Sequence, residues 1–154
     1  MIRIVPAGID HLAGIQACAK AAYALYVDRI GREPAPMVAP FERQIADGLV
    51  CAALDEDGTV RGFVTFYPRS DHMHLENVAV SPSYQGRGLG RALIHHCEQQ
   101  ALALGFSTVE LYTNARMTEN LVLYPRLGYR VTGRRQEDGF DRVFFSKELA
   151  SPSR

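Results

Sequence analysis

Residues 75–90 read LENVAVSPSYQGRGLG, and this stretch decides the fold. It starts as a β-rich run, breaks at Ser81-Pro82 and passes through three glycines into an amphipathic helical pattern. The first N–H groups of a helix have no partner within it, and the helix dipole adds partial positive charge there. Glycines at 86, 88 and 90 leave the backbone open to a pyrophosphate. The stretch therefore predicts an anion-binding strand–loop–helix unit, with a plain strand-to-helix turn as the alternative.

The spacing of the glycines distinguishes between classes of phosphate-containing ligand. A dinucleotide fingerprint needs glycine or alanine three residues after its second glycine, and this chain has Arg91 or Leu93 there. A Walker-type loop needs Gly-Lys followed by Ser or Thr, and the sequence contains no such triplet. Nicotinamide dinucleotides and nucleoside triphosphates are therefore disfavoured.

Hydrophobic periodicity and the positions of glycine and proline predict the elements on either side. We expect strands at Ile2–Val5, Leu49–Leu54, Val60–Tyr67, His72–Val80, Ser107–Thr113, Tyr129–Thr132 and Arg142–Lys147, and helices at His11–Ile30, Phe41–Asp47, Gly88–Leu104 and Thr118–Leu127. Asp10 is expected to cap the first helix. The order βααβββαβαββ predicts an α/β (α+β) fold, in which helices cover both faces of a mixed, mostly antiparallel sheet of six to seven strands. One domain is expected over residues 1–150, with a disordered tail at 151–154.

Composition and charge narrow the class of protein. Hydrophobic residues make up 47% of the chain and charged residues 22%, as in ordinary globular domains. Seventeen basic side chains balance seventeen acidic ones, so no overall field favours nucleic acid or an anionic membrane. The cysteines are odd in number and far apart in the sequence, at Cys18, Cys51 and Cys97. This pattern indicates buried free thiols. Without a leader pattern or a long apolar run, a cytoplasmic protein is the expectation.

Two motifs resemble those of the GNAT superfamily of N-acetyltransferases. The central motif of that family is Gln or Arg, two residues, Gly, one residue, then Gly or Ala, and Gln85, Gly88 and Gly90 fill it. A second stretch, residues 117–129, is similar to the family's asparagine, tyrosine and Gly-aromatic segment. Two motifs at the family's usual separation are far more specific than one. The resemblance covers nearly the whole chain in element order, and it implies the GNAT-like form of the sheet.

The resemblance implies acetyl-CoA as co-substrate and no metal. In that family the glycine-loop amides hold the pyrophosphate of coenzyme A, and the preceding strand pairs with the pantetheine arm. The thioester lies between two splayed parallel strands, here those ending at Val80 and Thr113. The implied cofactor-binding residues are Val78, Ala79, Val80, Gln85, Gly86, Arg87, Gly88, Leu89, Gly90, Arg91, Asn120 and Tyr124.

Acetyl transfer needs a base for the amine, a donor to the oxyanion and a proton for the thiolate. Because alternate residues of a strand share a face, Glu76 shares one with Val78 and is our candidate base. His74 is the rival base, and a carboxylate merely paired on the sheet surface is the structural alternative for Glu76. Tyr124 matches the family tyrosine that protonates the coenzyme A sulfur, although the unusual Pro125 beside it predicts a bend.

These residues predict direct transfer of an acetyl group from acetyl-CoA to a primary amine of a small molecule or peptide. Cys97 has no adjacent base, which disfavours a covalent acetyl-cysteine route. The alternatives are a non-catalytic acyl-CoA sensor and a metal enzyme using His72, His74 and Glu76. The family resemblance implies that loops such as Tyr23–Met37 and the hairpin near Glu137 select the amine. It also implies a homodimer through the final strands.

Overall fold

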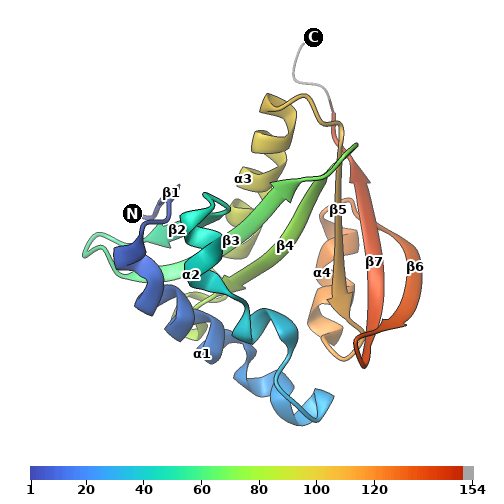
Figure 1. Cartoon of the computed structure of the whole chain (residues 1–154), viewed down its shortest axis with the longest axis horizontal. Coiled ribbons are helices and arrows are strands. Elements are labelled where there is room, and N and C mark those ends of the chain that lie inside the picture. The colour runs from blue at the N-terminus through green and yellow to red at the C-terminus, as the bar shows by residue number, and fades with distance from the viewer. Residues whose placement is uncertain (151–154) are drawn as a thin grey trace. The chain divides into compact units, whose positions relative to one another are not determined.

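The computed structural model describes residues 1–150, and its regular elements follow the predicted order (Figure 1). The helices are α1 (Leu12–Ile30), α2 (Phe41–Ala46), α3 (Leu89–Ala103) and α4 (Thr118–Arg126). The strands are β1 (Arg3–Pro6), β2 (Val50–Leu54), β3 (Val60–Pro68), β4 (Met73–Val80), β5 (Thr108–Asn114), β6 (Arg130–Glu137) and β7 (Phe140–Glu148). Short 3-10 helices are η1 (Ile9–His11), η2 (Ala35–Val38) and η3 (Pro82–Tyr84). The predicted tail at 151–154 lies outside the described residues.

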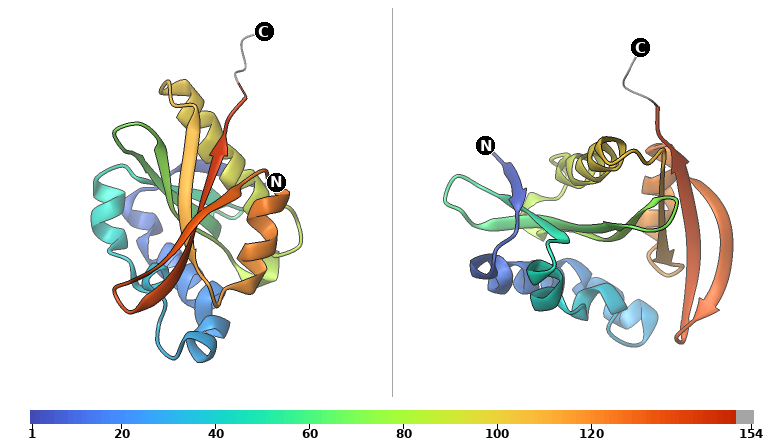
Figure 2. Two further views of the ribbon diagram at one scale, coloured as in Figure 1. Left: turned by 90° about the vertical axis from the view of Figure 1, so that its right-hand side faces the viewer. Right: turned by 45° about the horizontal axis from the view of Figure 1, so that its top comes forward.

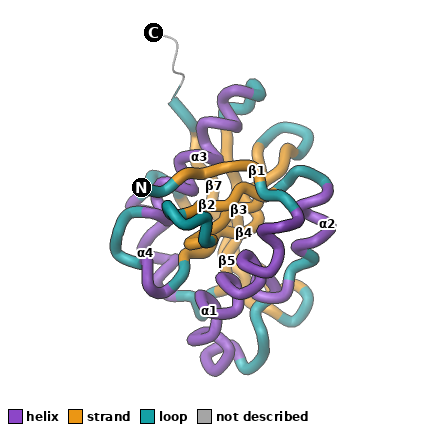
Figure 3. Tube along the Cα trace, turned by 90° about the vertical axis from the view of Figure 1, so that its left-hand side faces the viewer, coloured by secondary structure: helices purple, strands orange, loops and turns teal. Residues whose placement is uncertain are grey.

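The strands form one seven-stranded sheet in the order β1-β2-β3-β4-β5-β7-β6. Antiparallel ladders join β1 to β2, β2 to β3, β5 to β7 and β6 to β7. The pairing of β4 with β5 is parallel, with Met73 opposite Val109 and His74 opposite Glu110. The predicted mixed, mostly antiparallel sheet is confirmed. Figure 3 looks toward the edge formed by β1, which lies beside β2.

The chain divides into two compact units. The first comprises Met1–Phe66 and Glu76–Cys97, and the second comprises Tyr67–Leu75 and the described residues from Glu98 onward. The expectation of one domain over residues 1–150 remains a prediction. Among residues 1–150, no helix combines the length and apolar character needed to cross a membrane.

The first unit places its strands between helices. Helices α1 and α2 cover one face and α3 covers the other (Figure 2, right). On the α2 side, the rings of Phe41 and Phe63 meet edge to face at 5.3 Å. On the α3 side, a Cβ at Gly62 would lie 2.9 Å from the Ala79 carbonyl oxygen and 3.1 Å from Leu93. Glycine is required there because any side chain would displace backbone or helix.

The second unit is a hairpin-based layer covered by α4. β5, β7 and β6 lie in that order, and Val109, Leu111 and Phe145 are among its buried side chains. Burying each such side chain contributes about 1.5–3 kcal/mol. The β6–β7 turn is Asp138-Gly139, with φ of 53° and 80°, as a two-residue hairpin requires.

Two sequence predictions about local structure were wrong. Strand β6 extends to Glu137, five residues beyond the expected Thr132, because its mostly exposed polar residues conceal the β pattern at a sheet edge. Asp10 does not cap α1. It lies inside η1, whose preceding Gly8 N–H donates to His11 Nδ1 at 3.0 Å, so a histidine ring replaces the expected carboxylate.

Candidate functional site

The glycine loop joins η3 to α3 in the first unit. Gly86 and Gly88 have φ of 82° and 81°, a backbone region that disfavours other residues. Gln85 Nε2 donates to the Val80 carbonyl oxygen at 3.3 Å, which ties the loop to the end of β4. Gly90 lies in the first turn of α3 and has an ordinary helical backbone. The first two glycines therefore shape the loop, while the third only removes a side chain.

The start of α3 presents backbone donors to this loop. The helix begins at Leu89, and the Ala92 N–H donates to the Gly88 carbonyl oxygen at 3.1 Å. The helical N–H groups before Ala92 have no partner carbonyl within the helix. No acidic residue lies in the first turn to compete for those donors. Leu89 is buried, so the helix end is anchored while Arg91 remains exposed. This arrangement can hold an anion.

A stack of cations on an aromatic ring flanks the loop. The guanidinium carbons of Arg61 and Arg87 lie 4.9 Å and 4.4 Å from the centre of the Tyr84 ring. Arg61 Nε also donates to Asp55 Oδ2 at 2.7 Å, which lowers the pKa of the Asp55 carboxyl and raises the pKa of Arg61. Arg87 is thus already ordered, and it loses less side-chain freedom on binding an anion than an unrestrained arginine would.

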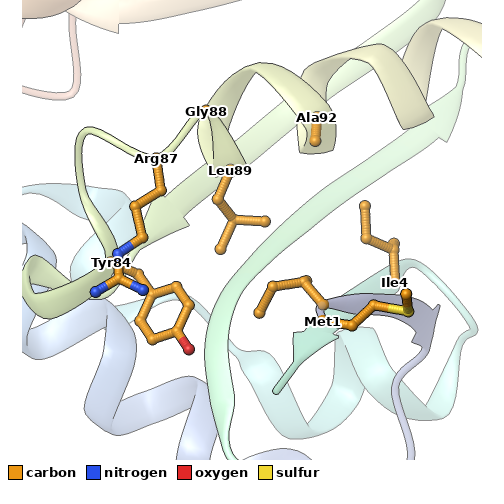
Figure 4. Close-up of a pocket in the computed structure, with 8 residues that line it drawn as sticks. Met1, Ile4, Tyr84, Arg87, Gly88, Leu89 and Ala92 are labelled. Atoms are coloured by element: carbon orange, nitrogen blue, oxygen red, sulfur yellow. The ribbon is translucent and has the colours of Figure 1, made fainter. Parts of the chain in front are cut away.

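A hollow of about 360 Å³ lies beside this stack. Figure 4 shows Arg87 extending from the loop toward Tyr84, with Leu89 and Ala92 on the neighbouring helix. The lining residues are Met1, Ile2, Ile4, Tyr84, Arg87, Gly88, Leu89 and Ala92. The loop therefore combines backbone donors, an ordered arginine and an apolar wall.

Strand β4 carries Glu76 next to a buried polar network that the sequence interpretation missed. Glu76 is half-buried, and the adjacent Asn77 is 4% exposed. The Tyr23 hydroxyl lies 2.7 Å from Asn77 Oδ1 and 3.0 Å from the Val78 carbonyl oxygen, and either oxygen can accept its single hydrogen. Asn77 Nδ2 donates to the Pro36 carbonyl oxygen. These bonds fix β4 to α1 and η2. An asparagine within an apolar strand was the available signal, because a buried amide needs partners.

His74, the rival base, lies in the second unit. It is 7% exposed, and its ring centre lies 5.2 Å from that of Tyr67 and 5.8 Å from that of Tyr112. Phe144 extends the row, 5.4 Å from Tyr112. Four rings from β3, β4, β5 and β7 therefore lie side by side, a row that no periodicity along one segment could reveal.

A hollow of about 520 Å³ adjoins this row. It is lined by Arg69, Ser70, His72, His74, Glu110, Leu111, Tyr112, Thr132, Arg135, Phe144 and Phe145. At its acidic side, His72 Nδ1 lies 2.7 Å from Asp71 Oδ1 and Nε2 lies 3.5 Å from Glu110 Oε1. The sequence interpretation singled out His72 and His74 from this set and missed the rest, which come from four separated segments.

Tyr124 is buried within α4. Its ring lies 5.7 Å from Tyr129 and 5.6 Å from Phe145, centre to centre. Pro125 does not interrupt the helix, which continues to Arg126, because a proline in the last turn removes only one helical hydrogen bond. The neighbouring motif tyrosine, Tyr129, donates its hydroxyl hydrogen to Glu98 Oε2 at 2.8 Å.

Two further contacts hold this motif. Asn120 Nδ2 donates to Thr113 Oγ1 at 3.0 Å, so the motif asparagine links α4 to β5. Lys147 Nζ lies 3.2 Å and 3.1 Å from the two carboxylate oxygens of Glu98. Glu98 is 8% exposed and needs both partners, since an unpaired buried carboxylate is costly. The motif residues Asn120 and Tyr129 therefore both make side-chain hydrogen bonds within the protein.

Two alternatives from the sequence, a metal site and a covalent thiol route, depend on His, Cys, Asp and Glu side chains. Within residues 1–150, no group of three or more such side chains is placed to hold a metal ion. Cys97 is fully buried in α3. Burial raises the pKa of Cys18 to about 11 and also raises the pKa of Cys51, so both stay protonated near neutral pH.

Comparison with known proteins adds independent findings. Residues 16–129 match the profile of a family described as the acetyltransferase (GNAT) family. Among curated proteins, the chain is 34% identical over 76 residues to the ribosomal protein bS18-alanine N-acetyltransferase of Escherichia coli strain K12, which covers 49% of this chain and 51% of that protein. It is 27% identical over 94 residues to streptothricin acetyltransferase of Streptomyces lavendulae, covering 60% and 50%. The chain therefore spans about half the length of these curated relatives.

Solved structures match over much more of the chain. The Escherichia coli ribosomal-protein-S18-alanine N-acetyltransferase has a TM-score of 0.74 at 23% identity, covering 100% of this chain and 99% of that one. A GNAT-family acetyltransferase from Staphylococcus aureus Mu50 has a TM-score of 0.80 at 13% identity, covering 97% and 100%. PaiA N-acetyltransferase from Thermoplasma acidophilum, solved in complex with coenzyme A, has a TM-score of 0.74 at 17% identity, covering 97% and 99%. At these identities the likeness shows a shared fold.

Proposed function

The chain belongs to the acetyltransferase (GNAT) family, and from that premise we propose that it transfers an acetyl group from acetyl-CoA to a primary amine of a small molecule or peptide. The glycine loop carries the proposal. Its two left-handed glycines, the donors at the start of α3 and the absence of acidic residues in the first turn of that helix suit a pyrophosphate. The relatives' names differ in acceptor, so the amine is not carried over from them.

The cofactor-binding roles follow the motif residues. Residues 85–91 would hold the pyrophosphate, with Arg87 adding charge and the backbone of Val78, Ala79 and Val80 facing the pantetheine arm. Asn120 and Tyr124, which lie in the second unit, are also proposed to bind the cofactor. Arg87 is stacked on the Tyr84 ring, which supports this role because a stacked arginine loses less side-chain freedom when it binds a phosphate.

The chemistry would proceed by direct attack. The amine nitrogen forms a bond to the thioester carbonyl carbon, the C–S bond breaks, the amine proton leaves to a base and the thiolate gains a proton from an acid. Coenzyme A supplies the activated acetyl group. Glu76 is our proposed base, His74 its rival, and Tyr124 the proposed acid. The burial of Tyr124 between two rings supports a fixed hydroxyl position.

Ligand-dependent stability tests the binding step. Coenzyme A at a hundred times its dissociation constant should raise the free energy of unfolding by about 2.7 kcal/mol, while NAD and ATP at the same concentration should change it little. Thermal unfolding of the protein with each ligand measures this. Equal shifts for ATP and coenzyme A would contradict the proposed specificity, and binding without amine-dependent turnover would indicate a sensor.

A further inference from the structure

The 520 Å³ hollow of the second unit has the size of a small-molecule site and a distinctive order of charges. Three rings of the row, His74, Tyr112 and Phe144, line it, and Tyr67 extends the row beyond His74. A cation is stacked at each end of that row, with the Arg69 guanidinium 5.2 Å from the Tyr67 ring and that of Arg135 4.0 Å from the Phe144 ring.

An acidic group lies along the middle of the row. Glu110 pairs with His74 in the parallel ladder and is two residues from Tyr112 on β5, so it shares their face of the sheet. Its carboxylate is about half exposed and has His72 Nε2 at 3.5 Å. A protonated amine entering the hollow would therefore meet an acidic partner in Glu110. At the Tyr112 ring, the Arg142 guanidinium already lies 4.5 Å from the ring centre.

The two arginines differ in whether an anionic side chain lies beside the guanidinium. Arg135 Nε lies 3.6 Å from Glu137 Oε2. Within residues 1–150, the Arg69 side chain contacts the Tyr67 ring and, at 3.2 Å, the Tyr67 hydroxyl, neither of which is an anion. Arg69 is therefore the better-placed partner for a carboxylate brought by a ligand.

We infer that this hollow binds the acceptor, and that the acceptor is a free α-amino acid with a large apolar side chain, above all an aromatic one. Its amine lies toward Glu110, its carboxylate pairs with Arg69, and its side chain lies along the ring row. The inference rests on the proposed acetyl transfer and names its substrate class. The presence of His74, a candidate base, in the wall of the hollow places an acceptor there rather than a remote effector.

A cycle of kinetic measurements tests this inference. The carboxylate is removed from the substrate, and the arginine is replaced in the protein. The substrates are phenylalanine, phenylalanine amide and phenylethylamine, and the proteins are the parent, Arg69→Gln and Arg135→Gln. A charge-assisted hydrogen bond corresponds to about a ten- to hundredfold preference. We expect kcat/KM for phenylalanine to exceed that for phenylethylamine by this factor in the parent, and we expect Arg69→Gln to abolish this preference. Arg135→Gln should reduce the preference less.

Arg134→Gln is the matched control, because Arg134 neighbours Arg135 in the sequence, does not line the hollow and donates to Asp141 instead. It should keep the full preference. Calorimetric titration of phenylalanine into protein loaded with coenzyme A gives the same comparison without turnover. The inference is overturned if phenylethylamine or the amide equals phenylalanine, or if Arg69→Gln retains the preference. Failure of the proposed function looks different, since coenzyme A then neither binds nor is released with any amine.

Discussion

Replacing Gly88 by alanine tests whether the left-handed loop binds the cofactor. At φ of 81° an alanine is strained by roughly 1–2 kcal/mol, and the added Cβ would meet nothing within 4 Å, so the whole cost comes from the backbone. Gly90→Ala is the matched control. There the Cβ would meet Val80 Cγ2 at an ordinary 3.7 Å in a helical turn, where alanine is favoured over glycine by up to about 1 kcal/mol.

The two changes should therefore have opposite signs. If the loop of the Gly88→Ala protein keeps its conformation, the free energy of unfolding falls by the full strain. If the loop relaxes, the strain appears instead as about five- to thirtyfold weaker coenzyme A binding. Urea unfolding together with calorimetric titration of coenzyme A measures both parts. The reasoning is refuted if Gly88→Ala changes neither quantity, or if Gly90→Ala weakens binding as much.

Three other substitutions test the remaining roles. Tyr124→Phe should lower turnover roughly a hundredfold or more and keep acetyl-CoA affinity, as single-turnover kinetics and titration would show; unchanged turnover removes the tyrosine from the chemistry. Glu76→Gln should lose most of its rate at neutral pH and regain it as rising pH deprotonates the amine, with His74→Gln milder; a pH–rate profile that overlays the parent's would assign the base elsewhere. Tyr23→Phe should lower the free energy of unfolding by about 1–3 kcal/mol, measured in denaturant, because Asn77 loses a buried donor; an unchanged value would mean the network is dispensable.

Local signals in the sequence were sufficient for the order of elements and for the glycine loop. Gly31, Gly105 and Gly128 all adopt positive φ within two residues of the ends of α1, α3 and α4. A glycine, a proline or an alternating run acts through a few neighbouring residues, so it can be interpreted without knowing the rest of the fold.

What the sequence did not reveal depends on contacts between distant segments. The ring row requires β5 to lie beside β4, and the Glu98–Tyr129 bond joins α3 to the start of β6 across 31 positions. The polar residues of β6 are paired with β7 by the hairpin ladder, for example Arg134 with Val143, so backbone bonding overrides their low β preference. Asn77, a polar residue within the apolar run of β4, was the available signal for its network.

The stoichiometry of acetyl transfer tests the proposed function most directly. Purified protein is incubated with acetyl-CoA and a panel of primary amines that includes amino acids, polyamines and peptides, and free coenzyme A thiol and acetylated amine are quantified in the same samples by mass spectrometry. The account predicts that at least one amine releases coenzyme A and that each thiol released is matched by one acetylated amine. Coenzyme A binding without amine-dependent release, or release without any acetylated amine, would contradict it.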